Sequence, residues 1–161
     1  MTTALIALGA NLGDRAGQIA SAVASLGRLE QTRVLATSAL IETEPIGLAD
    51  QPRFLNGVAA LTTALAPAGL LAAMLAIERT HGRERSVPNA PRTLDLDLLF
   101  YGQERITLPG LTVPHPRWQQ RMFVLVPLRE ILAAPALAGA GEWDALRAET
   151  ERQIAAQSPA Q

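Results

Sequence analysis

Two aspartates, Asp95 and Asp97, stand two residues apart in "PRTLDLDLLFYG", a largely apolar stretch at residues 91–102. Alternate residues of a β-strand point to the same face, so a strand here would turn both carboxylates to one side and the neighbouring leucines to the core. With a rise of about 3.3 Å per residue, the two Cα atoms would lie about 6.6 Å apart. Carboxylates this close repel each other unless something positive lies beside them. The pair therefore predicts either a Mg²⁺ site or a solvated face whose charges nearby arginines neutralise.

Arginines flank the aspartate pair on both sides. Arg83, Arg85 and Arg92 precede it in a loop that also contains prolines, and Arg117 and Arg121 follow it after the next turn. Guanidinium groups bind phosphate oxygens in bidentate fashion, and Mg²⁺ typically binds one or two carboxylates together with substrate phosphates. The grouping favours a metal–polyphosphate site over the alternative that these arginines are solvated loop charges or counter-ions of the aspartates.

The composition excludes several other kinds of chemistry. The chain of 161 residues contains no cysteine, and all 14 of its Lys or Arg residues are arginines. Thiol nucleophiles, cysteine–zinc sites, Schiff-base lysines and the lysine of a Walker A loop are therefore ruled out. The chain has two histidines, His81 and His115, so a three-histidine metal site is impossible within one chain. His81 lies on the apolar side of a predicted helix end and is interpreted as structural. The net charge of −1 gives no general reason to expect nucleic acid or a membrane as partner.

The order of the predicted elements indicates an α+β fold. Apolar periodicity predicts both helices and strands along the chain. They are a strand at 3–9, a helix from about 14, strands at 32–43 and 53–65, a helix from 67 to about 82, and the aspartate-bearing strand from 94. This βαββαβ order matches the ferredoxin-like pattern. We therefore expect a two-layer sandwich with an antiparallel sheet, with helices on one face and the other face free for a site.

The remaining residues are expected to add short C-terminal elements to the same domain. After an apolar segment at 122–128, the pattern predicts a short helix at 129–134, a loop at 135–142 and a surface helix at 142–156. The length of 161 residues fits a single domain, 1–161, in which about 156–161 form a frayed tail. The apolar start lacks a basic flank and no apolar run approaches the ~20 residues of a membrane span, so we expect a cytoplasmic protein.

Four further residues are candidates for binding a ligand. Asn56 lies in an apolar strand, where it would either bond to backbone or read the edge of a flat heterocycle. Phe54 and Phe123 would either fill the core or clamp a planar ligand. His115, between two prolines in "VPHP", would either stabilise a rigid turn or donate a ring N–H to a phosphate. The segment "GANLGD" contains two glycines before a predicted helix. We interpret it as a turn or a helix cap rather than as a phosphate-binding loop.

Five segments, in order from about residue 4 to residue 132, resemble one enzyme family. They are "IALGANLGD", "ETEPIG…DQPRFLNGV", "IERTHGRERS", "PRTLDLDLL" and "LTVPHPRWQQRMFVLVPL". Together they are similar to 6-hydroxymethyl-7,8-dihydropterin pyrophosphokinases of folate biosynthesis. The resemblance implies transfer of pyrophosphate from ATP to the hydroxymethyl group of the pterin, with release of AMP. The substrates would then be small molecules, ATP and the reduced pterin. Separately, we expect no nucleic acid or membrane as partner, and a monomer.

The resemblance also implies roles for individual residues. The paired aspartates would bind two Mg²⁺ ions that bridge the triphosphate, and two loop arginines would complete the catalytic set, which is Arg83, Arg92, Asp95 and Asp97. The ATP-binding residues would be Glu78, Arg83, Arg85, Arg92, Leu98, Thr112, His115 and Arg121, with Leu98 and Thr112 acting mainly through backbone. The pterin-binding residues would be Thr43, Pro45, Ile46, Gly47, Phe54, Asn56, Asp95 and Phe123.

The loop before the aspartates departs from the family pattern. Pro88 stands where a basic residue is usual, and Asn89 stands where some members place an aromatic residue. We therefore expect weaker ATP binding or altered loop closure. Three alternatives remain open: another metal-dependent nucleotidyl transferase or cyclase on a ferredoxin-like fold, a non-catalytic module that binds RNA or protein, and a degenerate enzyme that binds without turnover.

Overall fold

The structure, a computed structural model, describes residues 1–43, 53–81 and 94–158. Its first part contains β1 (Thr2–Ala10), α1 (Arg15–Gly27), β2 (Thr32–Thr37), β3 (Ile41–Thr43), β4 (Phe54–Thr63), α2 (Pro67–Thr80) and β5 (Asp95–Tyr101). Its second part contains β6 (Ile106–Leu108), β7 (Leu111–Val113), α3 (Met122–Ala133), α4 (Pro135–Ala138) and α5 (Asp144–Gln157), with short 3₁₀ turns at Trp118–Gln120 and Gly141–Trp143.

The main sheet is antiparallel and has the strand order β2-β4-β1-β5. The predicted α+β class and the βαββαβ order are confirmed, but the strand predicted at 32–43 is divided. Its first half, β2, pairs with one end of β4, and its second half, β3, pairs with the other end. The local sequence is strand-forming throughout, and pairing with β4 decides where the strand breaks.

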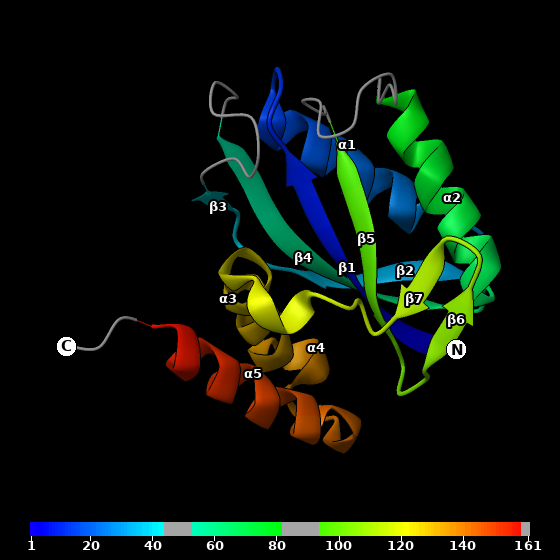
Figure 1. Ribbon diagram of the computed structural model, residues 1–161. Coiled ribbons are helices and arrows are strands. Elements are labelled where there is room, and N and C mark those ends of the chain that lie inside the picture. The colour runs from blue at the N-terminus through cyan, green and yellow to red at the C-terminus, as the bar shows by residue number, and fades with distance from the viewer. Residues whose placement is uncertain (44–52, 82–93, 159–161) are drawn as a thin grey trace.

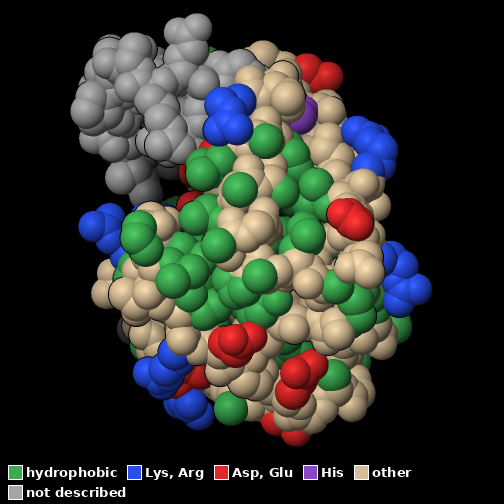
Figure 2. Space-filling model, turned by 90° about the vertical axis from the view of Figure 1, so that its right-hand side faces the viewer, with side chains coloured by type: hydrophobic (Ala, Val, Ile, Leu, Met, Phe, Trp, Pro, Cys, Tyr) green, Lys and Arg blue, Asp and Glu red, His purple; other side chains and the backbone are tan. Residues whose placement is uncertain are grey.

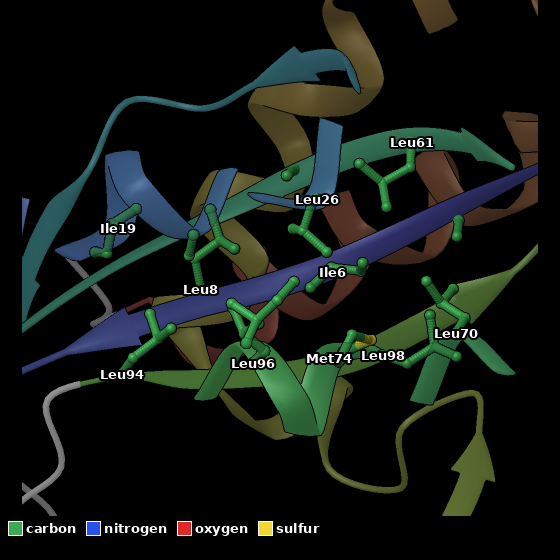
Figure 3. Close-up of a cluster of buried hydrophobic side chains, with 14 of the residues drawn as sticks. Ile6, Leu8, Ile19, Leu26, Leu61, Leu70, Met74, Leu94, Leu96 and Leu98 are labelled. Atoms are coloured by element: carbon green, nitrogen blue, oxygen red, sulfur yellow. The ribbon is translucent and has the colours of Figure 1, made fainter. Parts of the chain in front are cut away.

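One face of the sheet packs against α1 and α2, as predicted (Figure 1). Leu96 and Leu98 of β5, and Leu94 directly before it, point into this layer together with Ile6 and Leu8 of β1 (Figure 3). Because side chains alternate along a strand, Asp95 and Asp97 lie on the opposite face. Both aspartates are half-buried, so the predicted separation of leucines and carboxylates is confirmed.

The expectation that the second face is free is wrong over half of the sheet. Leu5, Val58 and Phe100 project from that face into a second apolar cluster, which α3 and the C-terminal helices cover (Figure 1). β1 and β4 carry apolar residues on both of their faces, as strands do when both faces are buried. An additional layer is therefore required over this part of the sheet. Gly9, Asn56 and the aspartates lie on the same face but outside the second apolar cluster.

The C-terminal layer is more helical than the sequence predicts. Residues 122–133 form one continuous helix, α3, that includes Pro127, and the predicted loop at 135–142 contains α4 and a 3₁₀ turn. The surface helix is confirmed as α5 and continues to Gln157. Arg147 of α5 donates hydrogen bonds to the backbone carbonyls of Leu132 (3.1 Å) and Ala140 (3.2 Å), and also to that of Leu137. This arginine ties α5 to the ends of α3 and α4.

Figure 2 shows apolar side chains gathered on the face of the molecule that carries α2 and the β6–β7 hairpin. A shallow pocket of about 330 Å³ on this face is lined by Ala68, Leu71, Ala72, Leu75, Leu108 and Pro109. None of these side chains can transfer a proton or bind a metal, so this pocket carries no chemistry. Among the helices of the described ranges, none is long and apolar enough to cross a membrane.

Candidate active site

The strand register places Gly9 between two of the predicted site residues. Gly9 of β1 lies directly opposite Asn56 of β4 on one side and Asp95 of β5 on the other. Neighbouring strands are about 4.8 Å apart, so Asn56 and Asp95 flank a gap of about 10 Å on the face that carries the aspartates. A Cβ atom at Gly9 would lie 3.1 Å from Asn56 Oδ1 and 4.0 Å from the Phe54 ring. The missing side chain at Gly9 therefore keeps this part of the face open.

Asn56 is held in one orientation by Thr43. Its Nδ2 donates a hydrogen bond of 2.6 Å to the Thr43 hydroxyl, and β3 and β4 bring the two residues together. Asn56 as a residue is 8% exposed. The predicted requirement for a partner is thus met by a side chain rather than by backbone. The amide oxygen remains directed toward the space above Gly9.

A third side of the site comes from the segment between β7 and α3. The backbone N–H of His115 donates to the carbonyl of Leu99 (3.0 Å), which holds this segment against the outer edge of β5. The His115 Nδ1 accepts a hydrogen bond from the Arg117 backbone N–H (3.1 Å). In the neutral ring the proton therefore lies on Nε2, which is available as a donor.

The charges around His115 identify its neighbours. Burial lowers the pKa of His115 below the ordinary value of 6.5, and the positive charges of Arg121 and Arg117 lower it further. The negative charge of Asp95 acts in the opposite direction. The structure thus brings an aspartate of β5, this histidine and Arg121 within electrostatic reach of one another.

Arg121 and Phe123 lie at the start of α3. The Arg121 guanidinium lies over the Phe123 ring, 5.5 Å from its centroid, in a cation–π contact. Phe123 is half-buried and packs against the second apolar cluster, so its ring borders the same face as Phe54. Both predicted aromatic residues therefore lie on the face of the sheet that carries the aspartates.

Glu78 is the one charged residue among the buried polar side chains of the described ranges. It is 1% exposed, and its Oε2 accepts a hydrogen bond of 2.8 Å from the Leu96 backbone N–H. This N–H points away from β1, and alternation places the backbone groups of Leu98 on the same outer edge of β5. The Leu98 side chain is in the core, so only its backbone can meet a ligand. Thr112, on the neighbouring strand β7, is exposed.

The segment "GANLGD" is a turn and a helix cap, as predicted. Gly13 has a φ of +66°, and the Asp14 side chain accepts a hydrogen bond of 3.1 Å from the Gly17 N–H at the start of α1. His81 is structural in the same sense, because its ring bonds to the Ile77 carbonyl (2.7 Å) and to the Ser21 hydroxyl (2.9 Å). Sequence reasoning missed Gly9, although a glycine inside a strand often marks a close approach of a ligand or another chain segment.

Several predicted residues lie outside the described residues: Pro45, Ile46, Gly47, Arg83, Arg85 and Arg92, together with Pro88 and Asn89. Within the described ranges, no group of three or more His, Cys, Asp or Glu side chains is arranged to hold a metal ion. Asp95 and Asp97 fit a Mg²⁺ site of another kind, since both are half-buried on one face and Mg²⁺ typically binds one or two carboxylates together with substrate phosphates.

Comparisons with known proteins identify the family. Residues 5–133 match the family model of 7,8-dihydro-6-hydroxymethylpterin-pyrophosphokinase (HPPK). A 2-amino-4-hydroxy-6-hydroxymethyldihydropteridine pyrophosphokinase of Pseudomonas aeruginosa is 51% identical over 126 residues, which cover 78% of each chain. The enzyme of the same name from Bacillus subtilis is 42% identical over 150 residues, 93% of this chain and 86% of its own.

The fold is also shared with a solved structure. A crystal structure of an HPPK-DHPS in complex with substrates superposes with a TM-score of 0.63 at 13% identity, over 96% of this chain and 44% of that one. This likeness confirms the fold, while the sequence matches identify the family. The chain belongs to the HPPK family and is a pyrophosphokinase of folate biosynthesis.

Proposed function

We propose that this pyrophosphokinase transfers pyrophosphate from ATP to the hydroxymethyl group of 6-hydroxymethyl-7,8-dihydropterin and releases AMP. The observation that carries the proposal is the register that leaves Gly9 open between Asn56 and Asp95. A flat bicyclic ring laid across this gap would meet an amide at one end and a carboxylate at the other. That arrangement directs the reactive substituent of the ring toward the aspartates.

The pterin would be read by the amide of Asn56 and enclosed by aromatic rings. Asn56 is oriented by Thr43, so its oxygen and second N–H can pair with the donor and acceptor edge of the heterocycle. Phe54 and Phe123 would contact the two faces of the ring. Pro45, Ile46 and Gly47 complete the proposed pterin set on the basis of the family resemblance.

ATP would lie along the outer edge of β5. The backbone groups of Leu98 and of Thr112 are proposed to meet the nucleoside, with Glu78 nearby, although the contact observed for Glu78 is to Leu96. His115 Nε2–H and the Arg121 guanidinium are proposed to contact phosphate oxygens. Arg83, Arg85 and Arg92 are assigned to the triphosphate from the resemblance.

Asp95 and Asp97 are proposed to hold two Mg²⁺ ions. Bound metal would neutralise the triphosphate and bring the attacking and leaving oxygens together. The pterin hydroxyl oxygen bonds to the β-phosphorus of ATP and loses its proton to water, while the bond from the β-phosphorus to the α–β bridging oxygen breaks, so AMP leaves with that oxygen. The protein's own residues bind and orient both substrates, which supplies most of the catalysis in phosphoryl-group transfer without a side-chain nucleophile.

Product analysis tests the proposal. The protein is incubated with ATP, Mg²⁺ and reduced hydroxymethylpterin, and the nucleotide products are separated by chromatography. We expect AMP and a pyrophosphorylated pterin in equal amounts. Free pyrophosphate with a nucleotidyl product would instead indicate a nucleotidyl transferase or cyclase, and salt-sensitive RNA binding without pterin binding would indicate a binding module.

We also propose that the chain acts as a monomer and as a single domain over residues 1–161 in the cytoplasm. Only small molecules are then needed as partners. Light scattering during size-exclusion chromatography measures the mass directly, and a dimer mass at assay concentrations would contradict the monomer.

A further inference from the structure

Arg15 occupies an unfavourable position for a positive charge. It is the first residue of α1, where the helix dipole favours negative side chains. The guanidinium is directed away from the helix toward two strands. Its Nη1 donates one hydrogen bond to Glu42 Oε1 (2.9 Å) and another to the Arg53 carbonyl (2.7 Å). The position of Arg15 is therefore explained by these two contacts rather than by the helix.

Both contacts of Arg15 adjoin proposed pterin residues. Glu42 directly precedes Thr43 in β3, and Arg53 directly precedes Phe54 in β4. Thr43 and Phe54 are paired with each other across the two strands. A single guanidinium thus joins the backbones that carry the hydroxyl partner of Asn56 and one of the two aromatic rings.

β3 depends on such outside support. It is an edge strand of three residues, with pairs to β4 at Asn56, Leu55 and Phe54. An edge strand this short is held by few ladder bonds of its own. Arg15 connects β3 to α1. A short turn joins α1 to the end of β1, where Gly9 lies. Arg15 thus links the N-terminal end of α1 to β3 through Glu42 and to the start of β4 through the Arg53 carbonyl.

We propose that Arg15 is a positioning residue for the pterin subsite, acting through Glu42 and the Arg53 carbonyl to set Thr43, Phe54 and Asn56 relative to Gly9. This inference rests on the proposed function. The alternative is an ordinary surface ion pair. The Arg15 and Glu42 side chains are 29% and 47% exposed, and ion pairs at such exposure contribute little to stability. Loss of Arg15 should therefore change pterin binding more than it changes unfolding.

The test compares Arg15→Gln, Arg15→Lys and a matched control on the same helix, Arg28→Gln. The Arg28 guanidinium donates to the Ser25 hydroxyl (3.2 Å), and Arg28 is the C-cap residue at the other end of α1. For Arg15→Gln we expect the pterin KM to rise about tenfold, because small displacements of positioning groups are costly. The ATP KM, kcat and Tm should stay close to wild type. Arg15→Lys should restore most of the pterin KM, since one ammonium can donate to both oxygens.

A second measurement separates this inference from the proposed function. Fluorescence titration of each variant with 6-hydroxymethylpterin, in the presence of Mg²⁺ and a non-hydrolysable ATP analogue, reports pterin binding without turnover. Weaker pterin binding in Arg15→Gln, with rescue by Arg15→Lys, supports the positioning role even if AMP is not formed. An unchanged pterin KM and Kd in Arg15→Gln, or a parallel loss of ATP binding and Tm, overturns it while leaving the proposed function intact. A wild-type protein that neither binds pterin nor forms AMP overturns both.

Discussion

The Glu78 carboxylate accepts a 2.8 Å hydrogen bond from the backbone N–H of Leu96, the residue between Asp95 and Asp97. β5 is an edge strand of the sheet formed by the described residues, and this N–H points away from β1, its strand partner there. A buried carboxylate from α2 therefore takes the place of a neighbouring strand at the point where β5 carries both aspartates. The helix α2, which packs on one face of the sheet, thus holds β5 in place, and β5 carries Asp95 and Asp97 on the opposite face.

Replacing Glu78 should lower the stability of the protein, and by less when the new side chain keeps an oxygen that can accept the Leu96 hydrogen bond. Glu78→Ala leaves a buried N–H without an acceptor and creates a cavity, so we expect a loss of about 2–4 kcal/mol in the free energy of unfolding. Glu78→Gln keeps an oxygen acceptor and should lose less. Urea unfolding measures both variants, with Glu104→Ala as an exposed control that should change little. Equal stability of Glu78→Ala and wild type would contradict the role assigned to the Leu96 contact.

Asp97→Asn should remove nearly all turnover. An amide is a much weaker Mg²⁺ ligand than a carboxylate, and metal charge stabilisation is worth several kcal/mol, so kcat is expected to fall by about 10³-fold or more. Steady-state AMP formation over a range of Mg²⁺ concentrations checks this. Asp144→Asn, in α5 beside Arg147, is the matched control and should retain wild-type activity. Full turnover by Asp97→Asn would exclude the proposed metal site.

Gly9→Ala should selectively weaken pterin binding. The added methyl group would lie 3.1 Å from Asn56 Oδ1 and within the gap that the ring is proposed to occupy. We expect the pterin KM to rise at least about tenfold, in line with the cost of overpacking a site of 1–3 kcal/mol, while the ATP KM is unchanged. Gly69→Ala in α2 is the control, because nothing lies within 4 Å of its added Cβ. A normal pterin KM in Gly9→Ala would contradict the proposal that the pterin ring lies over Gly9 between Asn56 and Asp95.

His115 should make stability depend on pH. Its pKa in the folded protein is lowered, first by burial and then by Arg121 and Arg117, against the opposing effect of Asp95. Between the lowered pKa and the ordinary value of 6.5 the unfolded chain binds more protons, so the stability of the folded protein falls as the pH drops through this window. Above that window the effect is absent. Urea unfolding from pH 8 to about pH 5 should show the decline in wild type and a smaller one in His115→Gln. Identical pH profiles would refute the assignment.

The sequence alone determined the features that depend on local periodicity. The alternation of leucines and aspartates in β5 assigns the two faces of that strand, because successive side chains of any strand point in opposite directions. The βαββαβ order follows in the same way from apolar spacing and from turn residues such as Gly13. The family motifs then supplied the candidate site residues, of which Thr43, Phe54, Asn56, His115, Arg121 and Phe123 surround one open end of the sheet.

Only the tertiary structure decided the features that depend on long-range pairing. Registers with β4 divide residues 32–43 into two strands, and the apolar second face of β1 and β4 recruits α3 and α5. Register also places Gly9 between Asn56 and Asp95, whose strands are far apart in the sequence. Nothing in the sequence around Arg15 predicts that its side chain connects β3 and β4. The alternation of side chains along a strand depends only on the residues of that strand. Its register, and the helices that pack on it, depend on partners distant along the chain, and it is the register and the packing that place the site.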